Sequence, residues 1–348
     1  MTAQPRDIAG RVVSWQRRHG RQALPWQGTR DPYRVWLSEV MLQQTQVATV
    51  LSYYGRFLQR FPDVAALAAA QLDEVLALWS GLGYYSRARN LHRCAQVVVD
   101  EHGGCFPASS AGLAQLPGIG RSTAAAIAAF CWNERAAILD GNVKRVLARV
   151  LAYGEDLSHG GAVQVLWQRA EGLLPAAASD MPAYTQGLMD LGATVCLARN
   201  PSCLLCPLED MCLARSEQAP ERYPVRSRRL QRGSQSLWLL QARARDGSVW
   251  LEKRPAPGVW GGLYCLPVFE SREALASALP IAARSRLDDR APFVHVLTHR
   301  DLHLHPVAVE VTGAAMRRRE GAWFAGDEWP SLGLPAPVRR LLAESAPG

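Results

Sequence analysis

Hydrophobic and polar positions follow a helical period through the first two thirds of the chain. Apolar residues recur at spacings of three and four over residues 63–79, 86–101, 121–131 and 142–152. This spacing predicts helices that each bury one face. Short segments rich in glycine and proline separate the helices. The pattern therefore predicts a mainly α domain over residues 1–215.

The pattern changes after residue 215. Residues 216–235 lose the helical period and combine several arginines with prolines, which predicts an exposed basic linker. From residue 236 onward the chain has strand-like runs, such as 236–241, 249–253 and 302–311, with glycine and proline between them. We therefore expect a smaller α+β domain over residues 236–348.

Composition and charge narrow the class of protein. A chain of 348 residues that is 48% hydrophobic can bury more than one core. Its net charge of +8, from 39 basic and 31 acidic residues, favours a polyanionic partner. The N-terminus has no apolar run of signal-peptide length, and no stretch approaches a membrane span. We expect a cytoplasmic protein that does not contact a membrane.

Four cysteines cluster within residues 196–212. Six residues separate Cys196 from Cys203, two separate Cys203 from Cys206, and five separate Cys206 from Cys212. In a reducing cytosol such a cluster indicates a metal centre rather than disulfides. Four thiolates suit an iron–sulfur cluster or a tetrahedral zinc ion. We predict a [4Fe–4S] cluster, and zinc or two disulfides remain the alternatives on spacing alone.

A second motif, Leu-Pro-Gly-Ile-Gly-Arg-Ser-Thr, occupies residues 116–123 between two helical patterns. Gly118 and Gly120 allow a tight turn, and the second helix is expected to begin after Gly120. Its free N–H groups and positive dipole end would then face outward and could receive a phosphate. This form matches the helix-hairpin-helix motif that grips the DNA backbone, with a plain helix–helix corner as the alternative.

Two acidic residues stand in contrasting settings. Glu39 lies in an apolar stretch, where desolvation would raise its pKa and keep it protonated as a general acid. Asp140 precedes a predicted helix, whose N–H groups would stabilise its charge. Two carboxyl groups with opposed pKa shifts suit bond cleavage through an oxocarbenium-like transition state. The alternatives are a surface glutamate and a simple N-cap aspartate.

With these motifs in place, the chain resembles the MutY adenine DNA glycosylase family of the helix-hairpin-helix, endonuclease III-like superfamily. The resemblance rests on residues 36–46, 81–90, 116–123, 139–145 and the cysteine run, and it covers essentially the whole chain. It implies a six-helix barrel beside a cluster-binding module, followed by a Nudix-like domain. It also implies a monomer that excises adenine mispaired with 8-oxoguanine or guanine in double-stranded DNA, within the bacterial cytosol.

The resemblance also assigns roles to residues. It implies that Glu39 protonates adenine at N7, that Asp140 stabilises the resulting sugar cation, and that Asn142 helps to hold the site. Ser122 stands where bifunctional relatives carry a catalytic lysine, which implies a monofunctional enzyme. The residues matched to the adenine pocket are Trp26, Gln27, Leu42, Val47 and Gln186. Those matched to DNA contacts are Gln43, Gln44, Tyr84, Gly118, Gly120 and Ser122.

Leu297, Thr298 and His299 fall where the family usually has Phe-Ser-His, a loop that senses 8-oxoguanine. Leu297 replaces the aromatic residue, so a stacking role is in doubt, whereas the hydroxyl and imidazole are retained. The acids after the Nudix-like entry, Glu270 and Glu273, are scattered, so no magnesium box and no pyrophosphatase activity is expected.

Three other classes of function remain to be weighed. A non-catalytic DNA-binding protein would not require the Glu39 and Asp140 pair. An endonuclease III-like glycosylase/lyase is disfavoured by Ser122 and by the additional C-terminal domain. A Nudix hydrolase would lack its metal box.

Overall fold

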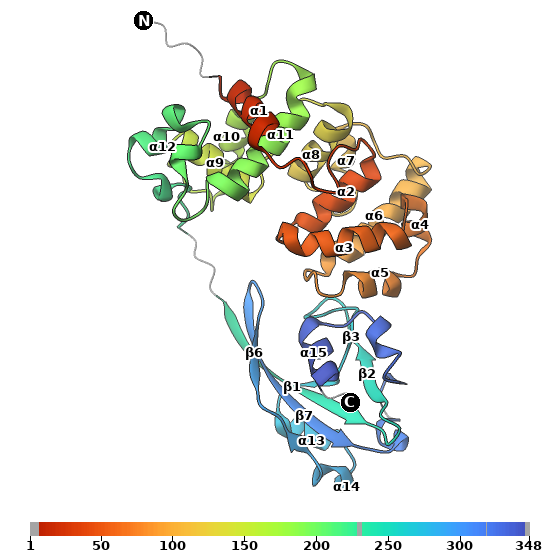
Figure 1. Cartoon of the computed structure of the whole chain (residues 1–348). Coiled ribbons are helices and arrows are strands. Elements are labelled where there is room, and N and C mark those ends of the chain that lie inside the picture. The colour runs from red at the N-terminus through yellow and green to blue at the C-terminus, as the bar shows by residue number, and fades with distance from the viewer. Residues whose placement is uncertain (1–6, 228–231, 318, 345–348) are drawn as a thin grey trace, which may run out of the picture. The chain divides into compact units, whose positions relative to one another are not determined.

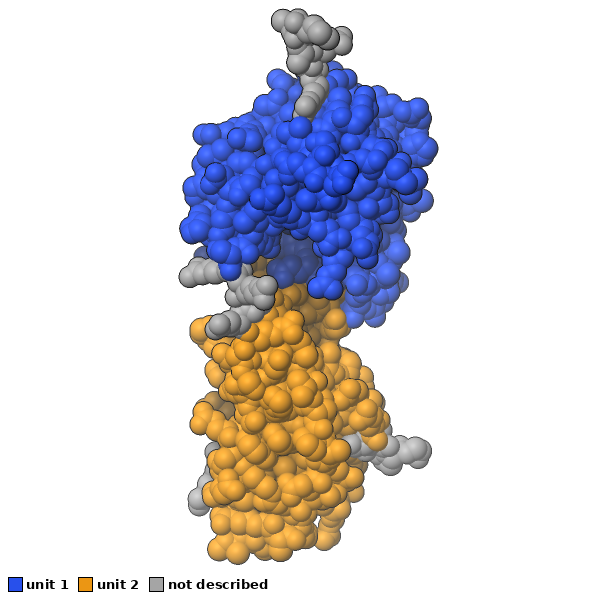
Figure 2. Space-filling model, turned by 90° about the vertical axis from the view of Figure 1, so that its left-hand side faces the viewer, with its two compact units in different colours: residues 1–68, 93–229 blue, residues 69–92, 230–348 orange. Residues whose placement is uncertain are grey.

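The computed structural model describes residues 7–227, 232–317 and 319–344. The chain divides into two compact units. Residues 1–68 and 93–229 form the first unit, and residues 69–92 and 230–348 form the second (Figure 2). Residues 69–92 therefore belong with the C-terminal part of the chain rather than with the helices that flank them in sequence.

The first unit is helical (Figure 1). Its longer helices are α1 (Ile8–His19), α2 (Pro32–Leu42), α3 (Val47–Arg60), α8 (Arg121–Trp132), α9 (Gly141–Val150), α10 (Gly160–Glu171) and α11 (Met181–Asp190). Shorter helices are α4 (Val64–Ala69), α7 (Ser110–Leu113) and α12 (Leu213–Ser216), and a π-helical turn covers Leu191–Val195. Helix α6 (Ser86–His102) contributes residues to both units.

Two helices of the first unit position the functional residues. Helix α2 begins where the Asp31 carboxylate accepts from the Tyr33 N–H, with Pro32 in the first turn, and its apolar side chains are buried on several sides. Helix α8 consists largely of buried alanines, which allow close packing on its neighbours. Helices α8, α9 and α11 share one apolar core that also includes residues of α1. The loops between these helices are therefore held on a rigid frame.

The expected helices occur, with one difference. Residues 86–101, 121–131 and 142–152 correspond to α6, α8 and α9. The single helix expected over 63–79 is instead two helices, α4 and α5 (Leu72–Trp79). The chain breaks at Gln71, whose extended backbone N-caps α5 in a capping box with Glu74. A capping signal thus interrupts a continuous apolar period.

The second unit contains a mixed sheet (Figure 1). The parallel strands β1 (Gly233–Arg243) and β7 (Arg300–Glu310) form its centre, paired along their whole length. The other strands are β2 (Val249–Lys253), β3 (Tyr264–Cys265), β4 (Val268–Phe269), β5 (Asp288–Asp289), β6 (Phe293–Val296) and β8 (Ala322–Phe324). The main path runs β3-β2-β1-β7-β5, and β4, β6 and β8 pair with β1, β7 and β2. The expected strands 236–241, 249–253 and 302–311 correspond to β1, β2 and β7.

Helices α13 (Arg272–Ser277), α14 (Ile281–Arg284) and α15 (Ala336–Glu344) complete the second unit. Leucines of α13 and the following turn join Trp250 and the valines of β7 in a core of their own. The α+β class expected for this part of the chain is confirmed. None of the helices in the described part of the chain is long and apolar enough to cross a bilayer.

Residues 216–235, expected as a linker, contain both short regular elements and irregular segments. A short 3₁₀ turn covers Pro220–Arg222, and β1 begins at Gly233. The Ser227 N–H donates to Asp156, so the segment before residue 228 is attached to the first unit. Residues 228–231, which include two of the arginines, lie outside the described residues.

Candidate active site and cysteine loop

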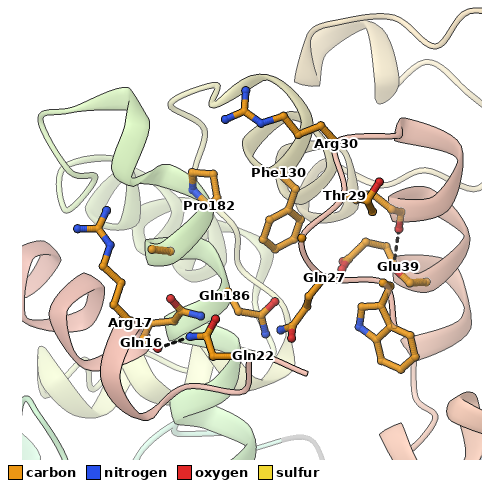
Figure 3. Close-up of a pocket in the computed structure, with 15 residues that line it drawn as sticks. Gln16, Arg17, Gln22, Gln27, Thr29, Arg30, Glu39, Phe130, Pro182 and Gln186 are labelled. Atoms are coloured by element: carbon orange, nitrogen blue, oxygen red, sulfur yellow. Dashed lines mark hydrogen bonds between the residues drawn. The ribbon is translucent and has the colours of Figure 1, made fainter. Parts of the chain in front are cut away.

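A pocket of about 390 Å³ opens in the first unit, within the size range of ligand sites. Its wall combines the end of α1, the loop before α2, and residues of α2, α8 and α11. Figure 3 shows Glu39, Gln27 and Gln186 among the residues that line it. Four of the sequence-predicted residues therefore share this pocket: Trp26, Gln27, Glu39 and Gln186.

Trp26 and Gln27 have fixed orientations. The Trp26 ring is buried and meets the Tyr54 ring edge to face, with ring centres 5.4 Å apart. Gln27 accepts a hydrogen bond from the Leu24 N–H at 3.1 Å through Oε1. Because a backbone N–H needs an acceptor, this bond leaves the NH₂ group of Gln27 as its donor toward other partners.

Gln186 is held by a buried ion pair that the sequence analysis missed. Its Nε2 donates to Asp190 Oδ1 at 2.8 Å, one helical turn away on α11. Asp190 is 1% exposed and also accepts from the Arg21 side chain and backbone N–H. The amide of Gln186 is therefore oriented by a carboxylate that cannot rotate freely. The spacing of Gln186 and Asp190 by four residues on an apolar helix was the available sequence signal.

Several further pocket residues also escaped the sequence analysis. Gln22 donates to the Gln16 carbonyl at 2.8 Å, as drawn in Figure 3, and both side chains line the pocket. Arg30 and Phe130 line it as well. They sit in segments without a recognisable motif, so only the fold brings them together.

Leu42 and Val47 are not among the residues that line this pocket. Leu42 ends α2 and Val47 begins α3, and both are half-buried. The last turn of α2 and the first turn of α3 lie on either side of the tight turn at Gln44, which has a φ of +56°. Their place in an adenine pocket stays a prediction.

Glu39 has the expected electrostatic character. Burial raises its pKa from 4.5 to about 7, and the nearby charge of Asp140 adds to the rise. At neutral pH a substantial fraction of this carboxyl group therefore holds a proton. It lies on the pocket wall, where it can donate that proton to a bound molecule.

Asp140 caps α9 as expected, since its carboxylate accepts from the Val143 N–H at 2.7 Å. The expected lowering of its pKa is wrong. Burial raises the pKa, and the N–H groups of Val143 and Asn142 with the neighbouring cations only oppose that rise. The sequence motif shows the cap but not the depth at which the cap is buried.

Ser122 and Asn142 support the segment around Asp140. Ser122 Oγ accepts from the Leu139 N–H at 3.0 Å, so its hydroxyl holds the residue before Asp140. Asn142 Oδ1 accepts from Arg145 at 2.9 Å. Arg145 also donates to the Gly192 carbonyl at 2.6 Å and to the Cys196 carbonyl at 2.8 Å. The start of α9 is thus tied to the segment that enters the cysteine loop.

The hairpin has the expected form. Gly118 has a φ of +77°, which favours glycine, and Gly120 N-caps α8 with an extended backbone. Both glycines are exposed, and a methyl group at Gly120 would meet no atom within 4 Å. Since glycine has no capping side chain, the first N–H groups of α8 remain available to an anion.

The remaining predicted DNA-contact residues lie at irregular backbone positions. Gln43 C-caps α2 and donates to Thr123 Oγ1 on α8 at 3.3 Å. Gln44 is exposed, with a positive φ. Tyr84 is 41% exposed, has a φ of +48° and belongs to the second unit. Such conformations are uncommon outside glycine and are concentrated at functional sites.

A second pocket, of about 730 Å³, lies within the second unit. Its lining includes Tyr84, Trp260, Leu297, Thr298 and His299. Thr298 and His299 form the turn between β6 and β7, and the Thr298 hydroxyl shares a hydrogen bond with the Tyr84 hydroxyl. The structure thus brings Tyr84 and Thr298 together, although they are 214 positions apart in sequence.

The four clustered cysteines also converge. Cys196, Cys203, Cys206 and Cys212 line one small cavity in the first unit. Burial raises the pKa of Cys206 to about 12, and it also raises the pKa of Cys212. Metal binding at this loop must therefore displace thiol protons. Among the described residues, no three Cys, His, Asp or Glu side chains are grouped as they are around a single metal ion.

Comparison with known proteins agrees with this arrangement. Residues 37–170 match the family model of the HhH-GPD superfamily base excision DNA repair protein. Residues 196–212 match the iron-sulfur binding domain of endonuclease III, and residues 238–344 match the NUDIX domain. The cysteine loop is therefore an iron–sulfur binding segment, and its cysteines are ligands rather than disulfide partners.

Curated relatives match over most of the chain. The adenine DNA glycosylase of Buchnera aphidicola subsp. Acyrthosiphon pisum is 34% identical, with 95% of each chain covered. The human adenine DNA glycosylase is 45% identical over 62% of this chain and 42% of its own length. Among solved structures, a thermostable thymine-DNA glycosylase is 27% identical with a TM-score of 0.55, over 60% of this chain and 95% of its own.

A structure of an endonuclease III–DNA complex, 21% identical with a TM-score of 0.51, covers 60% of this chain and 94% of its own and shares the fold. The full-length match to glycosylases, the cysteine loop and the buried carboxyl groups agree with one another. The chain belongs to the adenine DNA glycosylase family of the HhH-GPD superfamily and is an adenine-specific DNA N-glycosylase of base excision repair.

Proposed function

We propose that this enzyme excises adenine paired with 8-oxoguanine or guanine in double-stranded DNA, acting as a monofunctional monomer. The observation that carries the mechanism is the Glu39 carboxyl group on the wall of the 390 Å³ pocket, with its pKa raised to about 7. A glycosylase needs a proton donor at the base it removes, and a carboxyl group with this pKa is matched to neutral pH.

The substrate adenine must leave the duplex, because its glycosidic bond is inaccessible inside the stack. The fixed Trp26 ring would bound the extruded base on one side of the pocket. The NH₂ group of Gln27 and the amide of Gln186 would meet polar atoms on the base edge. Gln43, Gln44 and Tyr84 would fill the space left in the duplex, and the hairpin at Gly118 and Gly120 would hold the backbone.

The reaction uses the two half-buried carboxyl groups in turn. Glu39 donates its proton to adenine N7, the C1′–N9 bond breaks, and its electron pair leaves with the base. The ionised Asp140 faces the oxocarbenium ion that remains on the sugar and stabilises its charge. Water then adds to C1′ and loses a proton, which leaves an abasic site. Asn142, bonded to Arg145, supports the start of α9 next to Asp140.

Two observations support a monofunctional reaction. Ser122 offers a hydroxyl where a lyase would need an amine to form a Schiff base. That hydroxyl already accepts the Leu139 N–H, so its function here is to hold the Asp140 segment. The backbone of the abasic product would therefore stay intact until another agent cleaves it.

Recognition of the opposite base belongs to the pocket of the second unit. 8-Oxoguanine differs from guanine by an oxygen at C8 and a hydrogen on N7. The Thr298 hydroxyl can accept or donate there, and its bond to Tyr84 fixes its position. His299 is exposed in the same turn and can meet the lesion or a phosphate.

For the cysteine loop we propose a [4Fe–4S] cluster. Each iron of such a cluster takes one protein thiolate, so the four sulfurs surround a volume instead of meeting at one ion. The four cysteines fit that requirement, because they line one cavity and, among the described residues, no three of them are grouped as they would be around a single zinc ion. The cluster would close the loop that joins α9, α11 and α12.

The test is strand cleavage on duplexes that carry adenine opposite 8-oxoguanine, guanine or thymine. We expect alkali-dependent cleavage at adenine for the first two pairs and none for the third. Cleavage without alkali, or efficient trapping by borohydride, would indicate lyase chemistry instead. Tight binding without any adenine release would support a non-catalytic DNA-binding protein.

A further inference from the structure

Arg149 is a fully buried arginine next to the cysteine loop, on the last turn of α9. Its side chain is 2% exposed. A guanidinium keeps its charge under all ordinary conditions, and burial of a charge without compensation is costly. No carboxylate of the described residues lies within 4 Å of it, whereas the nearby Arg215 and Arg11 pair with Glu209 and Asp210.

Most contacts of the Arg149 guanidinium are to the cysteine loop, and one is to Tyr223 beyond it. Nε donates to the Tyr223 carbonyl at 3.0 Å, Nη1 to the Leu197 carbonyl at 2.6 Å, and Nη2 to the Ala198 carbonyl at 3.0 Å. Nη1 also lies 3.4 Å from Cys196 Sγ. The Arg149 backbone carbonyl accepts from the Cys212 thiol at 3.4 Å. One residue thus touches the first and the last cysteine of the run.

Carbonyl oxygens satisfy the donors of a guanidinium but do not neutralise it. A set of four thiolates around an iron–sulfur core is negatively charged, and hydrogen bonds to its sulfurs tune its potential. We propose that Arg149 is the buried counter-charge of the cluster and an N–H donor to the Cys196 sulfur, so that it retains the cluster and raises its reduction potential. This inference rests on an iron–sulfur cluster in the loop and not on adenine removal.

The positive charge of Arg149 determines in which direction it changes the reduction potential of the cluster. Reduction adds an electron to the cluster, and a fixed cation nearby favours the more negative form. Removal of the cation should therefore lower the reduction potential. It should also speed cluster loss, because the loop segment at Leu197 and Ala198 loses its shared anchor and the thiolates lose their compensation.

The experiment compares Arg149→Gln with Arg149→Lys in the full-length protein. For Arg149→Gln we expect less iron and sulfide per chain, a rate of absorbance loss under a chelator at least about tenfold higher, and a lower potential by voltammetry. Lysine keeps the charge but cannot span three carbonyls and a sulfur. Arg149→Lys should therefore stay near the wild-type potential and still lose iron faster.

The matched control is Arg11→Gln, because Arg11 also reaches this loop, at the Pro207 carbonyl and Asp210, but is exposed and paired. It should leave iron content and potential unchanged. If Arg149→Gln yields no folded protein, the Arg149→Lys comparison decides. A wild-type rate of iron loss in Arg149→Lys, or a wild-type potential in folded Arg149→Gln, would overturn the proposal. Adenine release is not used as a readout, so the two proposals can fail separately.

Discussion

At the scale of single residues, burial determines the chemistry of both carboxyl groups. Desolvation raises the pKa of Glu39 and also that of Asp140, although Asp140 has the better hydrogen-bond partners. Asp140 differs in accepting a backbone N–H and in lying near Arg145 and Lys144, both of which favour its charge. These partners support the proposed division of roles, in which Glu39 donates the proton and Asp140 stabilises the sugar cation.

This leads to a prediction about stability. The raised pKa of Glu39 means that the folded protein holds the proton more tightly than the unfolded chain. The contribution of Glu39 to the free energy of unfolding is therefore fully present below pH 4.5, and it is lost as the pH rises through about 7. Because each pKa unit corresponds to about 1.4 kcal/mol, Glu39→Gln should raise the free energy of unfolding at pH 8 by about 3 kcal/mol relative to its effect at pH 4.

Denaturant unfolding at the two pH values measures this difference. The control is Glu101→Gln, which changes an exposed acid on α6 and should show no such dependence on pH. An equal effect of Glu39→Gln at pH 4 and pH 8 would mean that the carboxyl group is not desolvated in the folded protein.

At the scale of elements, the two glycines of the hairpin before α8 are expected to affect different properties, one the stability of the fold and the other DNA binding. Gly118 has a left-handed backbone, whereas Gly120 has an extended one with open space around it. Gly118→Ala should cost about 1–2 kcal/mol of stability through backbone strain. Gly120→Ala should leave stability near wild type and weaken duplex binding, because its methyl group would stand where a phosphate approaches.

Thermal unfolding and the affinity for undamaged duplex, each measured for both variants, test this pair. Wild-type affinity in Gly120→Ala would show that the start of α8 does not contact the DNA backbone. A large loss of stability in that variant would show that the glycine serves the fold.

Local signals predicted most of the elements and the cysteine loop, because caps, glycines and thiol spacing act over short distances. The period over 63–79 concealed the break at Gln71, since apolar spacing continues across it. The sign of the Asp140 pKa shift and the role of Arg149 could not be predicted. They depend on burial by segments far away in sequence, such as the contact of Arg149 with Tyr223.

At the scale of the whole molecule, each unit contains its own large pocket. The pocket with Glu39 lies within the first unit, and the pocket with Thr298 lies within the second. In the function that we propose, chemistry on adenine and recognition of the opposite base would therefore reside in different units. The second unit also includes residues 69–92, so its pocket uses Tyr84 from the helical part of the sequence.

The independence of the two pockets can be tested with Thr298→Ala combined with His299→Ala. Loss of a base-edge contact costs about 1–3 kcal/mol, so activity on adenine opposite 8-oxoguanine should fall selectively. Activity on adenine opposite guanine should fall less. Single-turnover rates and affinities for both mispairs measure the effect, with His303→Ala on β7, outside the pocket, as the control. Equal losses on both mispairs would mean that the turn supports structure or general DNA binding.

The most direct test of the mechanism is the pH dependence of single-turnover adenine release from a duplex with adenine opposite 8-oxoguanine. The wild-type rate should fall as the pH rises through about 7, where Glu39 loses its proton, and should fall at low pH as Asp140 is protonated. Glu39→Gln should bind the mispair, release adenine about 10²–10⁴ times more slowly and lose the alkaline decline. A near wild-type rate in Glu39→Gln, or an alkaline decline that persists in that variant, would contradict the assignment of Glu39 as the proton donor.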